Sequence, residues 1–225
     1  MTNIIKTVNL SKSFFLKKNL NILKKISVEI KKGKLLALLG PSGSGKSTFL
    51  HMIALLDQPS SGEIYFEGKK TSLMNDFEKD EMRSKKISIV YQQNNLLNDF
   101  TSLENVAIAM ISFGKNKLTA MNEAKKILKK VGLSKRLDHF PSDLSVGEQQ
   151  RVAIARAAIN KPLLILADEP TGSLDQSSSG EIFNLFLKFK SQNRSIIYAT
   201  HNRELADKAD YKLKIIDGNI RRSNE

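Results

Sequence analysis

The chain has 225 residues, a formal net charge of +13 and no cysteine. This length allows one large domain with a sizeable core, and the lack of cysteine excludes disulfides and thiolate zinc sites. The lysine excess is spread in pairs, which favours solvated faces; weak attraction to anionic lipid headgroups is the functional alternative. The sequence has no basic patch interleaved with aromatic residues, the pattern that would indicate binding of nucleic acid.

Residues 1–6 contain no apolar core of the kind that signal peptides have, and the longest apolar runs, such as residues 106–111, are far shorter than a membrane span. The sequence therefore predicts a chain that is neither secreted nor membrane-spanning on its own.

The N-terminal third alternates strand-like and turn-like segments. Residues 4–10 and 25–39 are predicted as strands with a lysine-rich turn between them, and residues 61–68 as a strand bounded by turns. The apolar run 34–39 ends the second strand, and a helix-like run follows at 49–56. A glycine-rich loop joins the two.

This loop fits the pattern G-x-x-x-x-G-K-[ST] at every fixed position. Glycines let the backbone wrap closely around phosphates, and the amides form a concave anion site at the start of a helix. Lys46 would supply a charge for the β- and γ-phosphates, and the Ser47 hydroxyl would bind Mg²⁺. The predicted ATP-binding residues of the loop are Gly40, Pro41, Ser42, Gly43, Ser44, Gly45, Lys46, Ser47 and Thr48.

The rest of the chain alternates strands and helices. Residues 87–91 are predicted as a short buried strand and 101–160 as mainly helical, with Gly132 as a stop signal after an apolar face that includes Ala124. Strands alternating with helices predict a mainly parallel α/β sheet, with the helical block inserted in it. The remaining predicted elements are a buried strand at 163–167, a helix at about 176–191, a strand at 195–200, a short helix, and strands at 211–216 and 219–222.

The strand predicted at 163–167 ends in two carboxylates. Asp168 is placed to hold Mg²⁺, directly or through water. Glu169 would polarise the attacking water as a general base, which contributes on the order of 10²–10⁴-fold. A strand that ends in Asp-Glu is common by chance, but this one follows a phosphate-binding loop and precedes the segment 170–175. The combination indicates nucleotide hydrolysis.

A short segment between these two motifs resembles the LSGGE signature of ABC-type ATPases; it consists of Leu144, Ser145, Val146, Gly147 and Glu148. With this segment, the chain resembles the ATP-binding subunits of ABC transporters from end to end. The resemblance implies a P-loop NTPase (RecA-like) α/β core with a small antiparallel β subdomain and an inserted α-helical subdomain at about residues 95–160. It also implies a single ATP-binding domain over residues 1–225, with ATP and Mg²⁺ as cofactors.

The resemblance extends to further positions. Gln92 matches the Q-loop glutamine that touches Mg²⁺ and senses the membrane subunit, although Gln93 is adjacent and the register depends on Tyr91. His201 matches the switch histidine at the γ-phosphate. The implied catalytic residues are then Glu169, His201 and Lys46, the magnesium ligands Ser47, Gln92 and Asp168, and the D-loop Ser173, Leu174 and Asp175.

Phe14 matches the aromatic residue that stacks on adenine, with Phe15 as the competitor and a plain core role as the third possibility. One residue departs from the family pattern, because Val146 replaces the first of two glycines in the signature. A β-branched residue would be strained if this position needs a positive φ. Since Ser145 and Gly147 are kept, we infer a tolerated change.

In the family, ATP lies between the phosphate loop of one copy and the signature of the other. Ser145 and Gly147 would therefore act in trans, and the active unit would be a head-to-tail homodimer. The γ-phosphate would bridge the two halves until hydrolysis removes it.

Residues 50–59, 91–106 and 167–172 resemble the lipoprotein-releasing (Lol) ATP-binding subunits in particular. This implies a peripheral ATPase on the cytoplasmic face of an inner membrane, bound to permease subunits of the LolC/LolE type. It would release lipoproteins toward the outer membrane. Macrolide or peptide exporters and cell-division ATPases that signal to cell-wall hydrolases share much of the pattern and remain alternatives. A soluble DNA-repair or translation ATPase fits less well, because there is one cassette and little sequence separates Gln92 from Leu144.

Overall fold

Two β-sheets carry the fold in the part of the chain that the computed structural model describes, residues 2–15 and 19–223. The larger sheet has the order β11-β10-β4-β9-β8-β7, and its strands pair in parallel except for β11, which is antiparallel to β10. Its strands, in chain order, are β4 (Leu35–Leu39), β7 (Ile87–Val90), β8 (Leu164–Asp168), β9 (Ser195–Thr200), β10 (Tyr211–Ile216) and β11 (Asn219–Ser223).

Side chains of the parallel strands alternate between two cores, as the two-residue period of a strand requires. In β4, Leu35 and Ala37 belong to the core on one face, while Leu36 and Leu38 belong to the core on the other face. The strands β8 and β9 divide their residues in the same way. Both faces of the sheet are therefore covered, which explains the almost continuous apolar runs in these strands.

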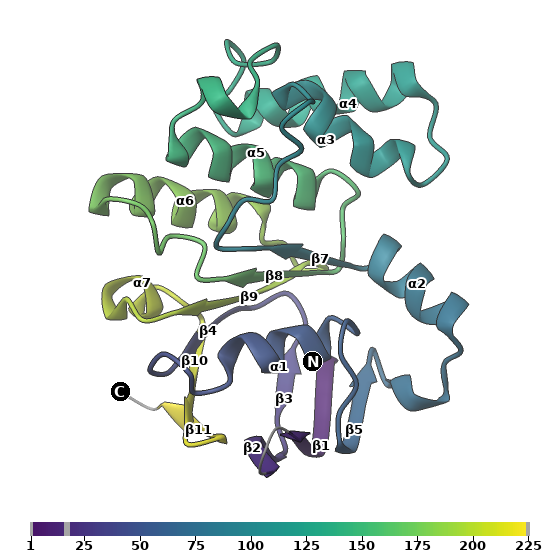
Figure 1. The fold of residues 1–225 in the computed structure, drawn as a ribbon, viewed down its shortest axis with the longest axis vertical. Helices are drawn as coiled ribbons and strands as arrows, with labels where there is room; N and C mark the ends of the chain where they lie inside the picture. Colours follow the sequence, from purple (N-terminus) through teal and green to yellow (C-terminus); the bar gives the residue numbers. More distant parts are fainter. Residues whose placement is uncertain (1, 16–18, 224–225) are drawn as a thin grey trace.

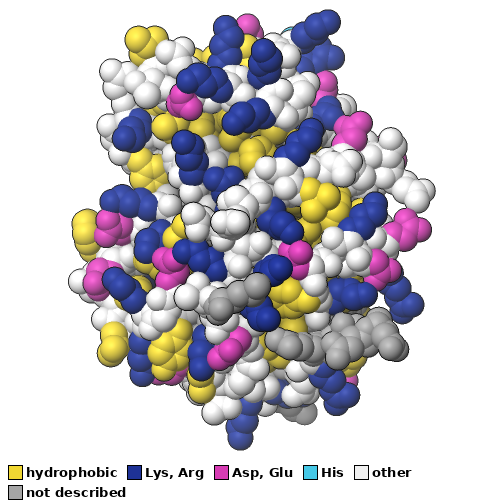
Figure 2. Space-filling model, turned by 180° about the vertical axis from the view of Figure 1, so that it is seen from behind, with side chains coloured by type: hydrophobic (Ala, Val, Ile, Leu, Met, Phe, Trp, Pro, Cys, Tyr) yellow, Lys and Arg dark blue, Asp and Glu magenta, His cyan; other side chains and the backbone are white. Residues whose placement is uncertain are grey.

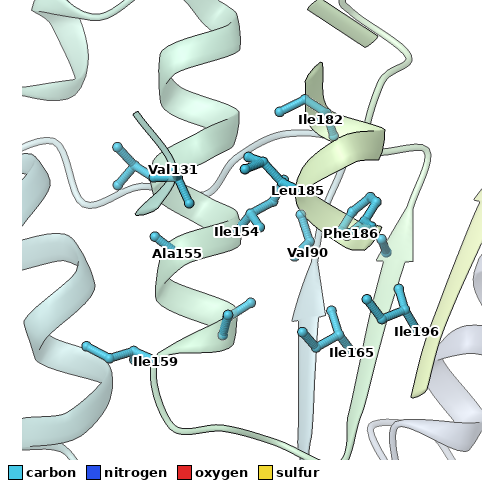
Figure 3. Close-up of a cluster of buried hydrophobic side chains, with 14 of the residues drawn as sticks. Val90, Val131, Ile154, Ala155, Ile159, Ile165, Ile182, Leu185, Phe186 and Ile196 are labelled. Atoms are coloured by element: carbon cyan, nitrogen blue, oxygen red, sulfur yellow. The ribbon is translucent and has the colours of Figure 1, made fainter. Parts of the chain in front are cut away.

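Helices α5 (Val146–Ala158) and α6 (Gln176–Phe189) cover one face of this sheet, and α3 (Ser102–Ile111) and α4 (Lys117–Lys130) form a further layer on top (Figure 1). Figure 3 shows how α5 and α6 pack: Ile154 and Phe186 lie near Val90, Ile165 and Ile196 of the strands. The helical layer is thus joined to the sheet through apolar contacts.

Helix α1 (Lys46–Ile53) lies against the other face, between the parallel sheet and the antiparallel sheet (Figure 1). Phe49 and Met52 of α1 are fully buried in the same core as Ile5 and Phe66 of the antiparallel sheet. That sheet consists of β1 (Asn3–Phe15), β2 (Asn19–Ile26), β3 (Glu29–Lys31), β5 (Ser61–Phe66) and β6 (Lys69–Lys70).

The remaining elements are short. Helix α2 (Asp76–Lys85) begins at a capping box in which Asn75 and Glu78 bind each other's backbone N–H, and it buries only Met82. Helix α7 (Arg203–Asp207) follows β9, and 3₁₀ turns occupy Thr71–Leu73 and Pro141–Asp143.

The predicted fold class is confirmed, with its α/β core, antiparallel β part and helical region, and most predicted strands and helices agree with the structure within a few residues. The N-terminal region was predicted wrongly. Residues 25–39 are not one strand, because Gly33 turns the chain with φ +72 beside the backbone of Gln192. The missed strand β2 pairs with β1, which extends to Phe15.

The predicted lysine-rich turn includes residues 16–18, which, like residues 1 and 224–225, lie outside the described residues. Helix α2 was not predicted at all, because a helix that buries one apolar side chain has no apolar stripe. The single domain over residues 1–225 and the subdomain bounds 95–160 stay predictions, and α3, α4 and α5 fall within those bounds.

Within residues 2–15 and 19–223, no helix has the length and apolar character needed to cross a membrane. Figure 2 shows Lys and Arg side chains scattered over one whole face, with acidic and apolar side chains between them. This distribution agrees with the interpretation of the positive charge as solvated surface.

Candidate active site

Four strand ends meet at one edge of the parallel sheet. Leu39 pairs with Thr200, Asp168 with Ala199, and Val90 with Ala167. The segments that follow these strands therefore leave the sheet side by side, at the carboxyl edge where α/β proteins bind ligands. They carry the predicted phosphate loop, Glu169, His201 and Gln92.

The phosphate loop turns into α1 at Gly45, which has φ +101 and lies at the N-cap of the helix. A side chain here would be strained, and its Cβ would lie 2.7 Å from Leu23 Cδ2 in β2. β2 thus supports the loop from behind. The loop needs glycine at this position for both conformational and packing reasons.

Lys46, the first residue of α1, is almost fully buried. Its Nζ donates hydrogen bonds to Gly40 O at 2.9 Å and Pro41 O at 3.2 Å, and lies 3.4 Å from Glu169 Oε1. The loop carbonyls therefore hold the ammonium group in the middle of the site, where an anionic substrate would meet it.

Glu169 directly follows β8 and makes hydrogen bonds to the end of β9 and to the residue after it. Its Oε2 lies 2.9 Å from His201 Nδ1, and its backbone N–H donates to Ala199 O at 3.1 Å. Its φ of 46° is unusual for a residue other than glycine and marks a conformation that the surroundings impose. The carboxylate is thus oriented from two sides, by Lys46 and by His201.

Asp168 ends β8, and its buried Oδ1 has no hydrogen-bond partner among the described residues. An unsatisfied buried acceptor costs about 1–3 kcal/mol, so a cation or a cation-bound water fits this position. Burial, together with the charge of Asp168, raises the pKa of Tyr91.

The described residues contain no group of three or more acidic, histidine or cysteine side chains that could hold a metal ion by themselves. The predicted magnesium ligands are instead one carboxylate, one hydroxyl and one amide, from Asp168, Ser47 and Gln92. This set suits Mg²⁺, which keeps water and substrate phosphate among its ligands.

These residues line one cleft of about 590 Å³. The structure brings together most of the phosphate loop and all predicted catalytic and magnesium-binding side chains. Phe14 does not line this cleft: the residue is 41% exposed, and Lys12 Nζ lies 4.9 Å from the centroid of its ring. The choice between Phe14 and Phe15 stays a prediction. The lining residues are Ile22, Ser42, Gly43, Gly45, Lys46, Ser47, Thr48, Gln92, Asp168, Glu169 and His201.

The predicted signature segment, residues 144–148, forms the start of α5 and does not line this cleft. Ser145 is the N-cap: its Oγ accepts from Glu148 N at 3.3 Å, and Glu148 Oε2 accepts from Ser145 N at 2.9 Å. Val146 is the first helical residue, is 48% exposed, and does not have a positive φ. The strain considered for a valine at this position therefore does not arise.

Comparison with known proteins identifies the family and the fold. The family model described as "ABC transporter" matches residues 23–172, about two thirds of the chain. This chain belongs to the ABC transporter family. It is 47% identical over 199 residues to the lipoprotein-releasing system ATP-binding protein LolD of Rickettsia bellii, with 87% of each chain covered. It is 40% identical over 220 residues to LolD of Aquifex aeolicus, with 98% and 97% covered.

Two solved structures of ABC cassettes have the same fold. One is the dimeric, post-hydrolysis state of the ATP-binding cassette MJ0796 bound to ADP and Pi, with a TM-score of 0.90, 36% identity and 97% of both chains covered. The other is the dimeric structure of MJ0796, a bacterial ABC transporter cassette, with a TM-score of 0.89. The recognition of this chain as an ABC ATPase is confirmed.

The predicted D-loop residues precede α6. Asp175 is the N-cap of α6 and accepts hydrogen bonds from Ser178 N at 3.0 Å and from Ser178 Oγ at 2.7 Å. The hydrogen bond from the hydroxyl, followed by that from the backbone N–H, lowers the pKa of Asp175. Leu174 packs against the core of the helical layer, and Leu174 and His201 line a second cavity of about 400 Å³. Ser173 lies in the turn between Glu169 and α6.

Sequence reasoning missed a connection between the segment that follows Gln92 and helix α5, which begins at the predicted signature. Arg156 of α5 donates from Nη1 to Asn95 O at 2.9 Å and from Nη2 to Asn94 O at 3.0 Å. Burial lowers the pKa of Arg156. The signal available in the sequence was an arginine within the apolar run of a helix, since such a charge needs buried partners.

Proposed function

We propose that this ABC ATPase hydrolyses ATP in the cleft at the carboxyl edge of the parallel sheet and uses the energy to release lipoproteins from an inner membrane toward an outer membrane. The position of the Glu169 carboxylate, 3.4 Å from Lys46 and 2.9 Å from His201, carries the proposal of hydrolysis. The cargo is inferred from the relatives named LolD, which match this chain over most of its length.

The predicted catalytic and magnesium-binding residues of the cleft have distinct roles in this proposal. The loop amides and Lys46 bind the β- and γ-phosphates, and Ser47, Gln92 and Asp168 hold Mg²⁺. The magnesium ion, when bound, neutralises phosphate charge. Glu169 orients the attacking water and accepts its proton, while His201 steadies Glu169 and contacts the γ-phosphate.

The active unit is a head-to-tail homodimer in which residues 144–148 complete the partner's site. Two observations support this arrangement. The signature does not line the cleft of its own chain, and both MJ0796 structures are described as dimeric. The D-loop residues Ser173, Leu174 and Asp175 lie between the cleft and α6 and would cross to the partner.

In this proposal the protein attaches peripherally to the cytoplasmic face of an inner membrane. Permeases of the LolC/LolE type hold it there, and it has no nucleic-acid partner. The test is to solubilise native membranes gently and identify what co-purifies with the tagged chain. Two related permeases with large periplasmic domains and bound lipoprotein are expected. ATP should then release lipoprotein from reconstituted vesicles, and the matched variant Glu169→Gln should bind the same permeases without release.

A division-site permease or an exporter subunit among the co-purified proteins would instead favour the corresponding alternative. The absence of any membrane partner in the presence of ATP would contradict the transporter function itself.

A further inference from the structure

The signature helix α5 starts with a carboxylate that is paired from two sides. Glu148 Oε1 accepts from Arg136 Nε at 2.9 Å, and Glu148 Oε2 accepts from Ser145 N at 2.9 Å. Arg136 lies in the segment between α4 and α5, and its Nη1 is also 3.2 Å from His139 Nε2. The Glu148 side chain is only 17% exposed, so water screens its charge incompletely.

This arrangement prepares Ser145 to donate a hydrogen bond. Its Oγ accepts from Glu148 N through a lone pair, which leaves the hydroxyl hydrogen free. The N-terminus of α5 adds a partial positive charge at the same place. Both features favour an anion in front of Ser145, which in the proposed dimer is the γ-phosphate of the partner's ATP.

Glu148 opposes this preference. The hydrogen bond from Arg136, followed by that from the Ser145 backbone, lowers the pKa of Glu148, so the carboxyl group is ionised at neutral pH. A carboxylate one helical turn from an approaching triphosphate repels it unless a cation neutralises it. Arg136 is the cation in contact with Glu148.

We propose that Arg136 is a positioning residue for the ATP-dependent dimer. It holds the Glu148 carboxylate on the Ser145 backbone and neutralises it, so that Ser145 can face the partner's nucleotide. This inference rests on the proposed function, because it requires ATP to join the two signatures.

Arg136 could act in two ways: it could neutralise the charge of Glu148, or it could act as a staple that only joins the segment between α4 and α5 to helix α5. The two roles can be separated by experiment. Arg136→Ala removes both the staple and the compensating charge. The double variant Arg136→Ala/Glu148→Gln still lacks the staple, but it no longer has an uncompensated carboxylate, and the amide oxygen of glutamine can accept from Ser145 N. Compensation therefore predicts rescue in the double variant, whereas stapling predicts none.

The experiment measures the dimer dissociation constant with saturating ATP, by analytical ultracentrifugation of the full chain carrying Glu169→Gln. Arg136→Ala should weaken the dimer by on the order of tenfold, as expected for an uncompensated charge at an interface. The double variant should return to within about threefold of the reference, and Arg136→Lys should lie between. ATP affinity of the monomer should not change, because residues 136 and 148 do not line its cleft.

Arg151→Ala is the matched control. Arg151 is also an arginine paired with a glutamate, Nη1 to Glu181 Oε2 at 2.5 Å, and it lies on the same helix α5. Its loss should leave the dimer unchanged. Equal weakening by Arg136→Ala and by the double variant, or no weakening by Arg136→Ala, overturns the inference.

Glu148→Gln alone keeps the test valid if Arg136→Ala does not fold. This variant should dimerise at least as tightly as the reference, and a dimer ten times weaker overturns the inference. If the Glu169→Gln reference stays monomeric with ATP and membrane partners, the proposed dimer fails and the role of Arg136 fails with it.

Discussion

Glu169 Oε2 lies 2.9 Å from His201 Nδ1, across the neighbouring ends of β8 and β9. The backbone of both residues is set by the register of the sheet, so the pair forms as a direct result of folding. A carboxylate held in this way beside Lys46 is suited to orient a water molecule and remove its proton.

Glu169→Gln keeps the shape of the side chain and removes its basicity. We expect kcat to fall by on the order of 10²–10⁴-fold while ATP binding remains, which traps an ATP-bound dimer. Steady-state hydrolysis and gel filtration with ATP measure the two effects. An ATP-loaded variant that stays monomeric even with its membrane partners would contradict the dimeric mechanism.

Val146→Gly restores the glycine that the ABC signature usually has. Val146 is half-exposed at the first position of α5 and has a helical backbone, so neither strain nor a core contact is at stake. ATPase activity should therefore change by no more than about fivefold, which corresponds to about 1 kcal/mol. A change on the order of 100-fold in either direction would contradict the inference that valine is tolerated at this position.

Gly45→Ala should damage both stability and nucleotide binding. The added Cβ would meet Leu23 Cδ2 at 2.7 Å on a left-handed backbone, a strain of about 1–3 kcal/mol. Gly180→Ala is the matched control, because Gly180 lies inside α6 with no atom near the new Cβ. That variant should gain about 0.5–1 kcal/mol from helix propensity. Urea unfolding compares the two, and equal effects would refute the role of the loop conformation.

Arg156→Ala leaves the carbonyls of Asn94 and Asn95 without their charged donor. Hydrogen bonds to charged groups are worth about 1.5–3 kcal/mol, so a loss of this size in the free energy of unfolding is expected. Arg156→Lys should recover only part of it, because an ammonium does not offer the planar fork that reaches both carbonyls. Full recovery by lysine would show that charge alone, without geometry, holds the backbone of Asn94 and Asn95.

The capping box of α3 makes stability depend on acidic pH. The backbone N–H of Thr101, and then its hydroxyl, lower the pKa of Glu104 in the folded chain. This contribution is fully present above the unfolded pKa of about 4.3 and is lost as the pH falls through the lower folded pKa. Urea unfolding between pH 7 and pH 3 should show a smaller acid loss for Glu104→Gln than for the unmodified chain. Identical slopes would exclude Glu104 as a contributor.

The parallel core was predictable from sequence because its strands are short apolar runs that end in recognisable motifs. β9 and β10 coincide with the predicted segments, and the phosphate loop lies between a strand and a helix as expected. Local chemistry was sufficient here, since each motif requires the element that precedes it.

The antiparallel region was less predictable because its order depends on distant partners. Residues 19–26 contain asparagines and lysines typical of a turn, yet burial of Leu23 and Ile26 against β1 makes them a strand. Helix α2 gave a different signal, the N-x-x-E pattern of Asn75 and Glu78, which a search for capping boxes would have found.

The site followed the same division. Lys46 and Glu169 were predicted from motifs whose spacing reflects the chemistry of phosphate, and both line the same cleft. Arg136 and Arg156 were missed, because their partners, Glu148 and the backbone of Asn94, are recognised only once the loops are placed in space.

The alternation of β8 between two cores has a consequence for how this protein tolerates length changes. Deleting one residue from the middle of β8 would exchange the faces to which its side chains point beyond the deletion, and Asp168 would turn away from the cleft. This one-residue shift would disrupt the packing on both faces of the sheet, and it would also displace the Asp168 carboxylate. Insertions in loops at the opposite, amino-terminal edge of the parallel strands would not change the side-chain alternation of any strand. Insertions that preserve folding and hydrolysis are therefore expected in those loops.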